Sequence, residues 1–428
     1  MHLLWENVIK NLFSLWTGQY KGLDEGQEHY QLDKKVWEAI GEASEASGAT
    51  IPYIFGQRPP NVASDKTMWT AELRCFWTQY MGPVLLQHRL NDKFYKHFVD
   101  LVKLINTCLQ FSVTKTEVTG LREGFIKWVK DYEGLYYQQN PSWLATCPVT
   151  IHALLHIADS IVAASPVWAY WAFPMERYCG ALQPAIRSRR YPYASLNRYV
   201  VDHDARMKQI KLRYDLQNEL SRGTSSRDNR VIFPNYETCS LLTPQETVIL
   251  TTGQRTQALG GLSTRFTGLD FEDVKRMFVA SAKVEEFGRL QIFEDGDQAR
   301  TSNLGQKKSE DRRDATFVRY SMFLDRHATR HHVRPEFDLR TFYGQLENLF
   351  VIKPLRHLLP PAKRAQVPPI IILAFIRRCN ALKKHRYGLD IHNYTGTGGV
   401  NVVEHMPYME MGFRLKRGYV YLLSSSYL

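Results

Sequence analysis

The chain has 428 residues, with 55 Lys and Arg against 43 Asp and Glu, and a formal net charge of +12 at pH 7. This length allows about two or three domains, and the basic balance favours polyanionic partners, either nucleic acid or an anionic membrane surface. The six cysteines include no C-x-x-C pair, which argues against a zinc ribbon or a thioredoxin-type site. No apolar run approaches the ~20 residues of a membrane span, and the N-terminus lacks signal-peptide features. We therefore expect an intracellular protein with no membrane partner.

The first half of the chain is expected to be α-helical. Residues 1–17 place apolar side chains at helical spacing from the first residue onward, which favours a chain that begins partway through a larger ancestral domain. Ser64 is the expected N-cap of a later helix, and the many Trp and Tyr residues are expected in the core. The remaining helices are expected over residues 34–47, 64–80, 94–111 and 115–137, within a helical region that covers 1–222.

A histidine pair lies in the next expected helix, residues 149–163. His152, His156 and Asp159 have i, i+4 and i+7 spacing, so they are expected on one face. Imidazoles one turn apart can hold a metal ion, but no third ligand is identifiable. We therefore favour a local polar cluster that steers its neighbours through hydrogen bonds, and an unrelated enzyme that uses these three side chains remains an alternative.

An acid and a series of arginines follow. A helix is expected over residues 175–186, with Glu176 in its first turn, where the helix dipole favours a carboxylate. Such an acid either serves only the helix start or binds a metal. Arginines alternate with tyrosines beyond it, which suits phosphate contacts combined with stacking on bases or sugars; a solvated basic helix is the alternative. The candidate DNA-binding residues are Arg177, Arg187, Arg189, Arg190 and Arg198.

The second half changes from mixed to β character. Residues 223–336 are expected to form a mixed linker region, with a helix beginning near 243–248, a helix over 271–286, and an exposed or disordered loop near 294–314. β-branched and aromatic runs separated by Gly and Pro predict a small antiparallel β domain over 337–428. The expected fold class is α+β, with a mainly α-helical N-terminal half.

The stretch TCPVTIHALLHIADSIVAASPVWAYWAFPMERYCGALQPAIRSRR, with MHLLWENVIKNL, TIPYIFGQRPPN and GFIKWVKDYEGLYYQ, resembles the C-terminal half of fungal-type CACTA (En/Spm) superfamily transposases. The resemblance implies a partial RNase H-like core with a helical insertion. It also implies a DDE set of three acids that holds two Mg²⁺ ions for phosphoryl displacement. On this basis Glu176 is the third catalytic acid and a metal ligand, His2 supports it, and the arginines that follow approach DNA.

In the family the two aspartates of the DDE set lie upstream of the MHLLWEN helix, so the resemblance places them before Met1. One carboxylate of three does not bind Mg²⁺ stably. We therefore expect a nuclear, transposase-derived protein that binds DNA, at transposon ends or as nonspecific duplex, and that is inactive alone. A homo-oligomer is a further state to test. An in-frame upstream region encoding two aspartates would restore the enzyme interpretation. The alternative is a domesticated DNA- or protein-interaction module without catalysis.

Overall fold

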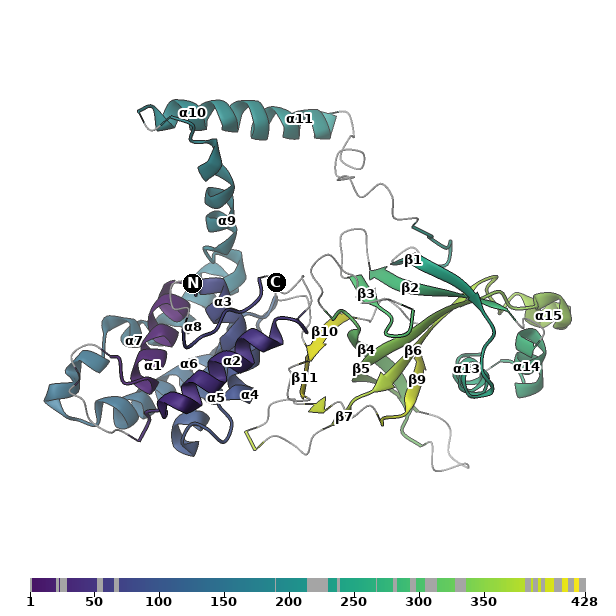
Figure 1. The fold of residues 1–428 in the computed structure, drawn as a ribbon, viewed down its shortest axis with the longest axis horizontal. Helices are drawn as coiled ribbons and strands as arrows, with labels where there is room; N and C mark the ends of the chain where they lie inside the picture. Colours follow the sequence, from purple (N-terminus) through teal and green to yellow (C-terminus); the bar gives the residue numbers. More distant parts are fainter. Residues whose placement is uncertain are drawn as a thin grey trace. The chain divides into compact units, whose positions relative to one another are not determined.

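The chain is a mixed α+β protein in its computed structural model, with helices before residue 214 and a largely antiparallel β region after residue 238 (Figure 1). It divides into two compact units, Met1–Lys10 with Leu104–Asp228 (unit 1) and Asn11–Lys103 with Asn229–Leu428 (unit 2). The structure describes residues 2–20, 23, 29–51, 57–64, 69–188, 190–213, 230–236, 239–266, 268–279, 283–292, 298–304, 314–327, 336–381, 386–387, 392–393, 397–403, 410–414 and 419–422.

All of the secondary-structure elements described in unit 1 are helical. Its longest helix begins with a reciprocal capping box, in which the Thr114 hydroxyl accepts from the Glu117 N–H and the Glu117 carboxylate accepts from the Thr114 N–H. Along this helix and the turn after it, the rings of Trp128, Tyr132 and Tyr136 follow one another with centroids 5.4 and 4.8 Å apart. The elements are η1 (His2–Val8), α6 (Lys115–Tyr132), η5 (Glu133–Tyr137), η6 (Pro141–Thr146), α7 (Val149–Ala153), η7 (Leu154–His156), α8 (Ile157–Ala164), η8 (Val167–Ala169), α9 (Phe173–Leu182), η9 (Gln183–Ala185), α10 (Pro192–Tyr199), η10 (Val200–Ala205) and α11 (Arg206–Arg213).

The N-terminal part of unit 2 is also helical and packs around Trp77. The rings of Phe13, Trp37 and Trp69 meet the Trp77 ring edge to face, at centroid distances of 4.9, 6.4 and 6.2 Å. The buried Trp77 Nε1–H donates to the hydroxyl of Ser44 at 3.0 Å, so the indole is both packed and hydrogen-bonded. The elements here are α1 (Ile9–Trp16), α2 (Lys34–Ser47), α3 (Ala71–Phe76), η4 (Trp77–Met81), α4 (Gly82–Leu85) and α5 (Asp92–Cys108).

The remainder of unit 2 contains one sheet of eleven described strands, all paired antiparallel, in the order β1-β2-β5-β4-β10-β11-β8-β7, with β3 on β2, β6 on β5 and β9 on β6. The strands are β1 (Cys239–Val248), β2 (Val284–Ile292), β3 (Gln298–Arg300), β4 (Phe317–Asp325), β5 (Phe337–Ile352), β6 (Ile371–Arg378), β7 (Asn380–Ala381), β8 (His392–Asn393), β9 (Val400–Val403), β10 (Glu410–Arg414) and β11 (Tyr419–Leu422).

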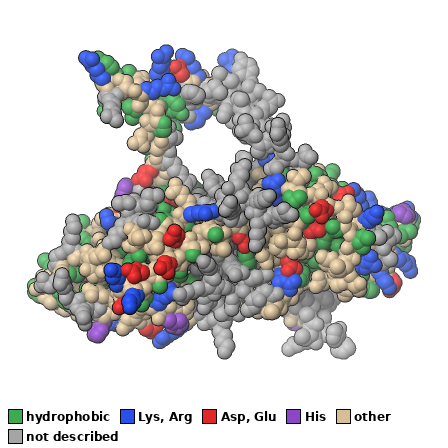
Figure 2. All heavy atoms as spheres, in the orientation of Figure 1, with side chains coloured by type: hydrophobic (Ala, Val, Ile, Leu, Met, Phe, Trp, Pro, Cys, Tyr) green, Lys and Arg blue, Asp and Glu red, His purple; other side chains and the backbone are tan. Residues whose placement is uncertain are grey.

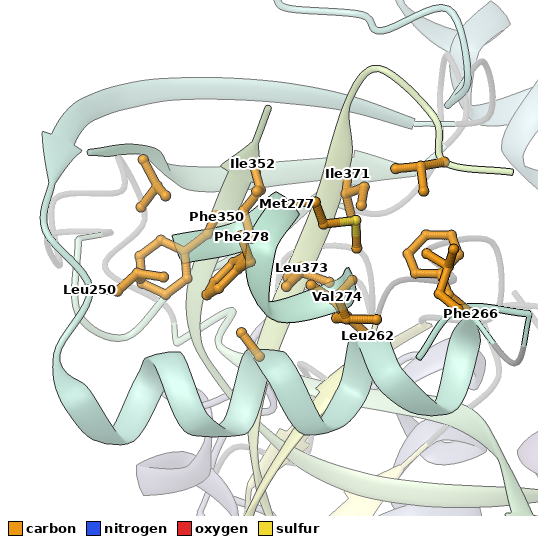
Figure 3. Close-up of a cluster of buried hydrophobic side chains, with 14 of the residues drawn as sticks. Leu250, Leu262, Phe266, Val274, Met277, Phe278, Phe350, Ile352, Ile371 and Leu373 are labelled. Atoms are coloured by element: carbon orange, nitrogen blue, oxygen red, sulfur yellow. The ribbon is translucent and has the colours of Figure 1, made fainter. Parts of the chain in front are cut away.

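Two helices, α13 (Thr252–Arg265) and α14 (Phe271–Val279), bury their apolar faces against β5 and β6 (Figure 3). Leu262 and Met277 from the helices meet Phe350 and Leu373 from the strands in one core cluster. Helices packed against a sheet in this way bury its apolar side chains, and a sheet needs such packing to be stable. A short turn and helix, η11 (Arg356–Leu358) and α15 (Pro361–Arg364), connect β5 to β6.

The helical predictions hold in outline. The helix expected over residues 34–47 has these bounds in α2, and α5 and α6 match the next two expected helices to within a few residues at each end. The expected N-cap at Ser64 is wrong, because the helix begins at Ala71. Thr70 is the cap, and its hydroxyl accepts from the Leu73 N–H at 3.3 Å.

The region before residue 337 holds more β structure than expected. The helix expected near 243–248 is wrong, since these residues belong to β1. The strand accommodates Pro244 at a bulge between Leu242 and Gln245, where proline needs no ladder donor. Gly288 on the neighbouring strand makes room, because a Cβ there would lie 2.7 Å from the Pro244 ring. The sheet thus begins ahead of the boundary expected at residue 337. Much of the loop expected near 294–314 lies outside the described residues, although β3 falls within it.

Candidate nucleic-acid interface

His2 and Glu176 come together in unit 1 although they are far apart in the sequence. His2 belongs to the first turn of η1, and Glu176 belongs to the first turn of α9, where its N–H donates to the Ala172 carbonyl at 2.9 Å. The His2 Nε2 and Glu176 Oε1 atoms are 3.3 Å apart, and the two side chains are 72% and 48% exposed. An ion pair this exposed contributes at most about 1 kcal/mol to stability. The contact therefore orients the carboxylate at the surface more than it stabilises the fold.

The pair is a poor fit for a magnesium ion. Mg²⁺ prefers an octahedral set of oxygen ligands, whereas this pair offers one carboxylate and one imidazole. Within the described ranges, no group of three or more His, Cys, Asp or Glu side chains is arranged to hold a metal ion.

The histidine pair meets as expected, but Asp159 does not join it. The Nε2 atoms of His152 and His156 are 3.3 Å apart and their rings meet edge to face. Asp159 instead forms an ion pair with Arg122 of α6, at 2.5 Å. The expected continuous helix is interrupted by the 3₁₀ turn η7 between α7 and α8. The two histidines still meet across this turn, whereas Asp159 pairs with another helix, so the expected three-residue face does not form.

Beyond α9 the chain forms a basic helical segment, residues 187–213, that we call the basic arm. In Figure 1, α10, η10 and α11 follow one another along a single rod, and Figure 2 shows Lys and Arg side chains gathered over it. Across 187–213 there are eight Lys and Arg against two Asp and Glu. The arm leaves its described side chains at least partly exposed, and none of those in α10 is buried.

The structure places three of the five candidate arginines on this arm. Arg187 and Arg190 are exposed in the segment between η9 and α10, and Arg198 is 87% exposed on α10. Arg198 Nε lies 3.8 Å from the Asp202 carboxylate, an exposed pair that leaves its other guanidinium donors available to a ligand. Arg189 and the side chain of Arg177 lie outside the described residues.

Two further cations on the arm were not singled out from the sequence. Arg206 Nη1 lies 2.9 Å from Asp202, and Lys208 Nζ lies 5.9 Å from the centre of the Tyr178 ring on α9. The second contact is within the reach of a cation–π interaction. Helical spacing would have pointed to Arg206, because Asp202 lies four residues after Arg198 and four residues before Arg206.

Large apolar side chains are exposed beside these cations. Tyr191 and Tyr193, which flank Pro192 at the start of α10, are 60% and 79% exposed. The others among the described side chains of α9, the arm and the segment between them are Met175, Tyr178, Ile186, Val201 and Leu212. Alternation of cations with exposed rings is a surface suited to nucleic acid, because it offers both phosphate contacts and π-faces.

Comparison with models of known families, with curated proteins and with solved structures finds no match to this chain. Among the helices that the structure describes, none alone is long and apolar enough to span a membrane. One bent pair, Val149–Ala164 and Val167–Ala185, together has the necessary length and composition, with a bend of 72°.

Proposed function

We propose that this chain is a transposase-derived, DNA-binding protein, similar to the C-terminal part of a DDE-type cut-and-paste transposase of the CACTA superfamily and acting in the nucleus. The proposal rests mainly on one observation, which is that the helix with Glu176 and the basic arm follow each other directly in the chain. The helix whose first turn holds Glu176 leads directly into the basic arm, with eight basic residues against two acidic ones. An acid of a strand-transfer site followed by a phosphate-binding surface is the order that such an enzyme needs.

The contact between His2 and Glu176 supports the resemblance independently of charge. These two residues were assigned to one site from sequence motifs at distant positions, and their side chains lie 3.3 Å apart. A partial RNase H-like core, in which a helix presents the last acid of the DDE set, accounts for why these positions meet. Local sequence rules reach only three or four residues along a helix and do not account for it.

DNA binding without cleavage is the activity that we propose for this chain alone. The family resemblance assigns one of three metal-binding acids to it, and a single carboxylate does not hold the two ions of an in-line phosphoryl displacement. The arginines need no metal, because a guanidinium binds phosphate directly with paired N–H donors.

The test is a salt titration of duplex binding. We expect the triple variant Arg187→Ala/Arg190→Ala/Arg198→Ala to bind a labelled duplex of about 30 base pairs more weakly than the wild type between about 50 and 200 mM salt. The slope of log affinity against log salt should fall by about 0.9 for each phosphate that the variant no longer neutralises. Fluorescence anisotropy measures both quantities.

A matched control removes three exposed lysines elsewhere on the chain, Lys35→Ala/Lys115→Ala/Lys130→Ala. It changes the net charge by the same amount, so it should lose only the weak, nonlocal part of the attraction. Absence of duplex binding by the wild type at low salt, or equal reductions in affinity for the two triple variants, would contradict the proposed role of the basic arm.

A further inference from the structure

The backbone at Tyr191 is hydrogen-bonded on both sides, while Tyr191 and Tyr193 are exposed to solvent. The Tyr191 N–H donates to the Ser188 hydroxyl at 3.1 Å, and its carbonyl accepts from the Ser195 N–H at 3.4 Å. Pro192 between the tyrosines restricts the backbone further at the first position of α10. Tyr191 and Tyr193 are 60% and 79% exposed, and a restrained backbone loses less conformational entropy when a flat ligand stacks on the side chains.

One cation lies against a ring, since the Arg190 guanidinium carbon is 5.4 Å from the centre of the Tyr191 ring. Arg187 is exposed and lies three residues before Arg190 in the sequence. Phosphate binding by the arginines would bring the sugar and base of the same nucleotide next to a tyrosine face. Duplex DNA cannot use those faces, because its bases are already stacked within the helix.

We propose that Tyr191 and Tyr193, together with Arg187 and Arg190, form a stacking site for unpaired bases of a DNA strand, so that the protein prefers DNA with a single-stranded segment to fully paired duplex. This inference rests on the proposed DNA-binding function and specifies its substrate class. Stacking of a base on an aromatic side chain strengthens binding by about 5- to 150-fold and tolerates any sequence, since every base has a π-face.

The charge of the arm favours this occupant over a second copy of the chain. Exposed rings also suit protein contacts, but two copies of the arm would bring together segments that each carry eight basic and two acidic residues. Like charges at such a contact are repulsive, whereas a DNA strand supplies the complementary charge.

The experiment compares a blunt duplex with the same duplex extended by an unpaired tail of about six nucleotides, with binding measured by fluorescence anisotropy at one salt concentration. We expect the wild type to bind the tailed DNA at least about 5-fold more tightly. The variant Tyr191→Ala/Tyr193→Ala should lose that preference and bind the tailed DNA no more tightly than the blunt duplex. Tyr191→Phe/Tyr193→Phe keeps the rings and should retain the preference.

The outcomes separate this inference from the proposed function. If the wild type binds neither DNA, the proposed function fails and the stacking site fails with it. If it binds both DNAs equally, only the stacking site is wrong. If the alanine variant keeps the preference for the tailed DNA, or if its only change is conversion of a dimer to a monomer in sedimentation, the tyrosines serve another purpose and the inference is overturned.

Discussion

Replacement of Ser44 by alanine tests the packing on which the helical part of unit 2 depends. The Ser44 hydroxyl accepts from Trp77 Nε1 at 3.0 Å and donates to the Ile40 carbonyl at 2.8 Å. Both Ser44 and Trp77 have no exposed surface. Without this hydroxyl, the indole N–H is left buried and without its acceptor.

The expected loss of stability follows from two opposing effects. A buried donor left unsatisfied costs about 1–3 kcal/mol of unfolding free energy. Alanine is the better helix former, and its higher propensity returns at most about 0.7 kcal/mol at this position within α2. We therefore expect Ser44→Ala to lower the free energy of unfolding by roughly 1–2 kcal/mol.

Urea unfolding, followed by both circular dichroism and tryptophan fluorescence, measures this change, and coincidence of the two transitions checks that a single free energy applies. Ser47→Ala is the matched control. Ser47 lies on the same helix, is buried, and its hydroxyl donates to the carbonyl four residues earlier at 2.7 Å, as that of Ser44 does. It accepts no indole N–H within the described part of the chain, so its replacement should change the free energy of unfolding by less than about 0.5 kcal/mol.

A double-mutant cycle with Trp77→Phe isolates the hydrogen bond. The single variant Trp77→Phe removes the donor and leaves a cavity, and should cost on the order of 2–4 kcal/mol. In that background Ser44→Ala leaves no buried donor without an acceptor. The double variant should therefore lose about 1–2 kcal/mol less unfolding free energy than the sum of the two single variants. Strict additivity, or equal effects of Ser44→Ala and Ser47→Ala, would refute the reasoning and show that the indole hydrogen bond contributes nothing to stability.

Three further predictions concern charge and hydrogen bonding. Burial raises the pKa of Glu286, which lies opposite Glu246 and accepts from Asn348, so protonation favours the folded state and the stability from this group grows as pH falls through the raised pKa. Glu286→Gln should therefore raise the free energy of unfolding near neutral pH by up to about 1 kcal/mol, which thermal unfolding would detect as a higher melting temperature. This gain in stability should be absent below the ordinary carboxyl pKa of 4.5. Tyr132→Phe, which removes a hydroxyl donating to a buried carbonyl at 2.8 Å, should lower the unfolding free energy in urea by about 1–3 kcal/mol. Glu176→Gln should leave duplex affinity equal or up to about 5-fold tighter with and without Mg²⁺; a Mg²⁺-dependent affinity that this change abolishes would indicate a bound metal.

Helices were predictable where short-range signals agree. Residues 34–47 combine a capping aspartate with apolar residues at helical spacing, and α2 has these bounds, with Asp33 accepting from the Lys35 N–H. A cap is harder to place where several candidates compete. Ser64 and Thr70 are both good capping types, and the local sequence does not decide between them.

The strands before residue 337 escaped prediction because their identity depends on partners distant in the sequence. In β1 the polar residues Gln245 to Thr247 are exposed, so the run resembles a helix start and carries a proline besides. Its pairing with β2, with Leu241 opposite Leu290, forms across an intervening pair of helices. Strand propensity depends strongly on such neighbours, so one strand read alone is ambiguous.

The candidate site likewise contains contacts that spacing along the sequence predicts and contacts that depend on distant elements. Spacing along one helix correctly brought His152 to His156, but Asp159 pairs with Arg122 on another helix. Spacing within one helix does not indicate a partner on a different one. The arginines were predictable as exposed, because charged side chains are seldom buried without a partner.

The contact between His2 and Glu176 could not be predicted from local sequence rules. Periodicity, capping and charge give no reason to pair two residues at distant positions, and only the resemblance of their motifs put them in one site. The pair is too exposed to contribute more than about 1 kcal/mol to stability, so folding alone gives little reason for it. The contact positions an acid at the start of the helix that leads into eight cations, and for this reason we count it in support of the proposed DNA-binding function.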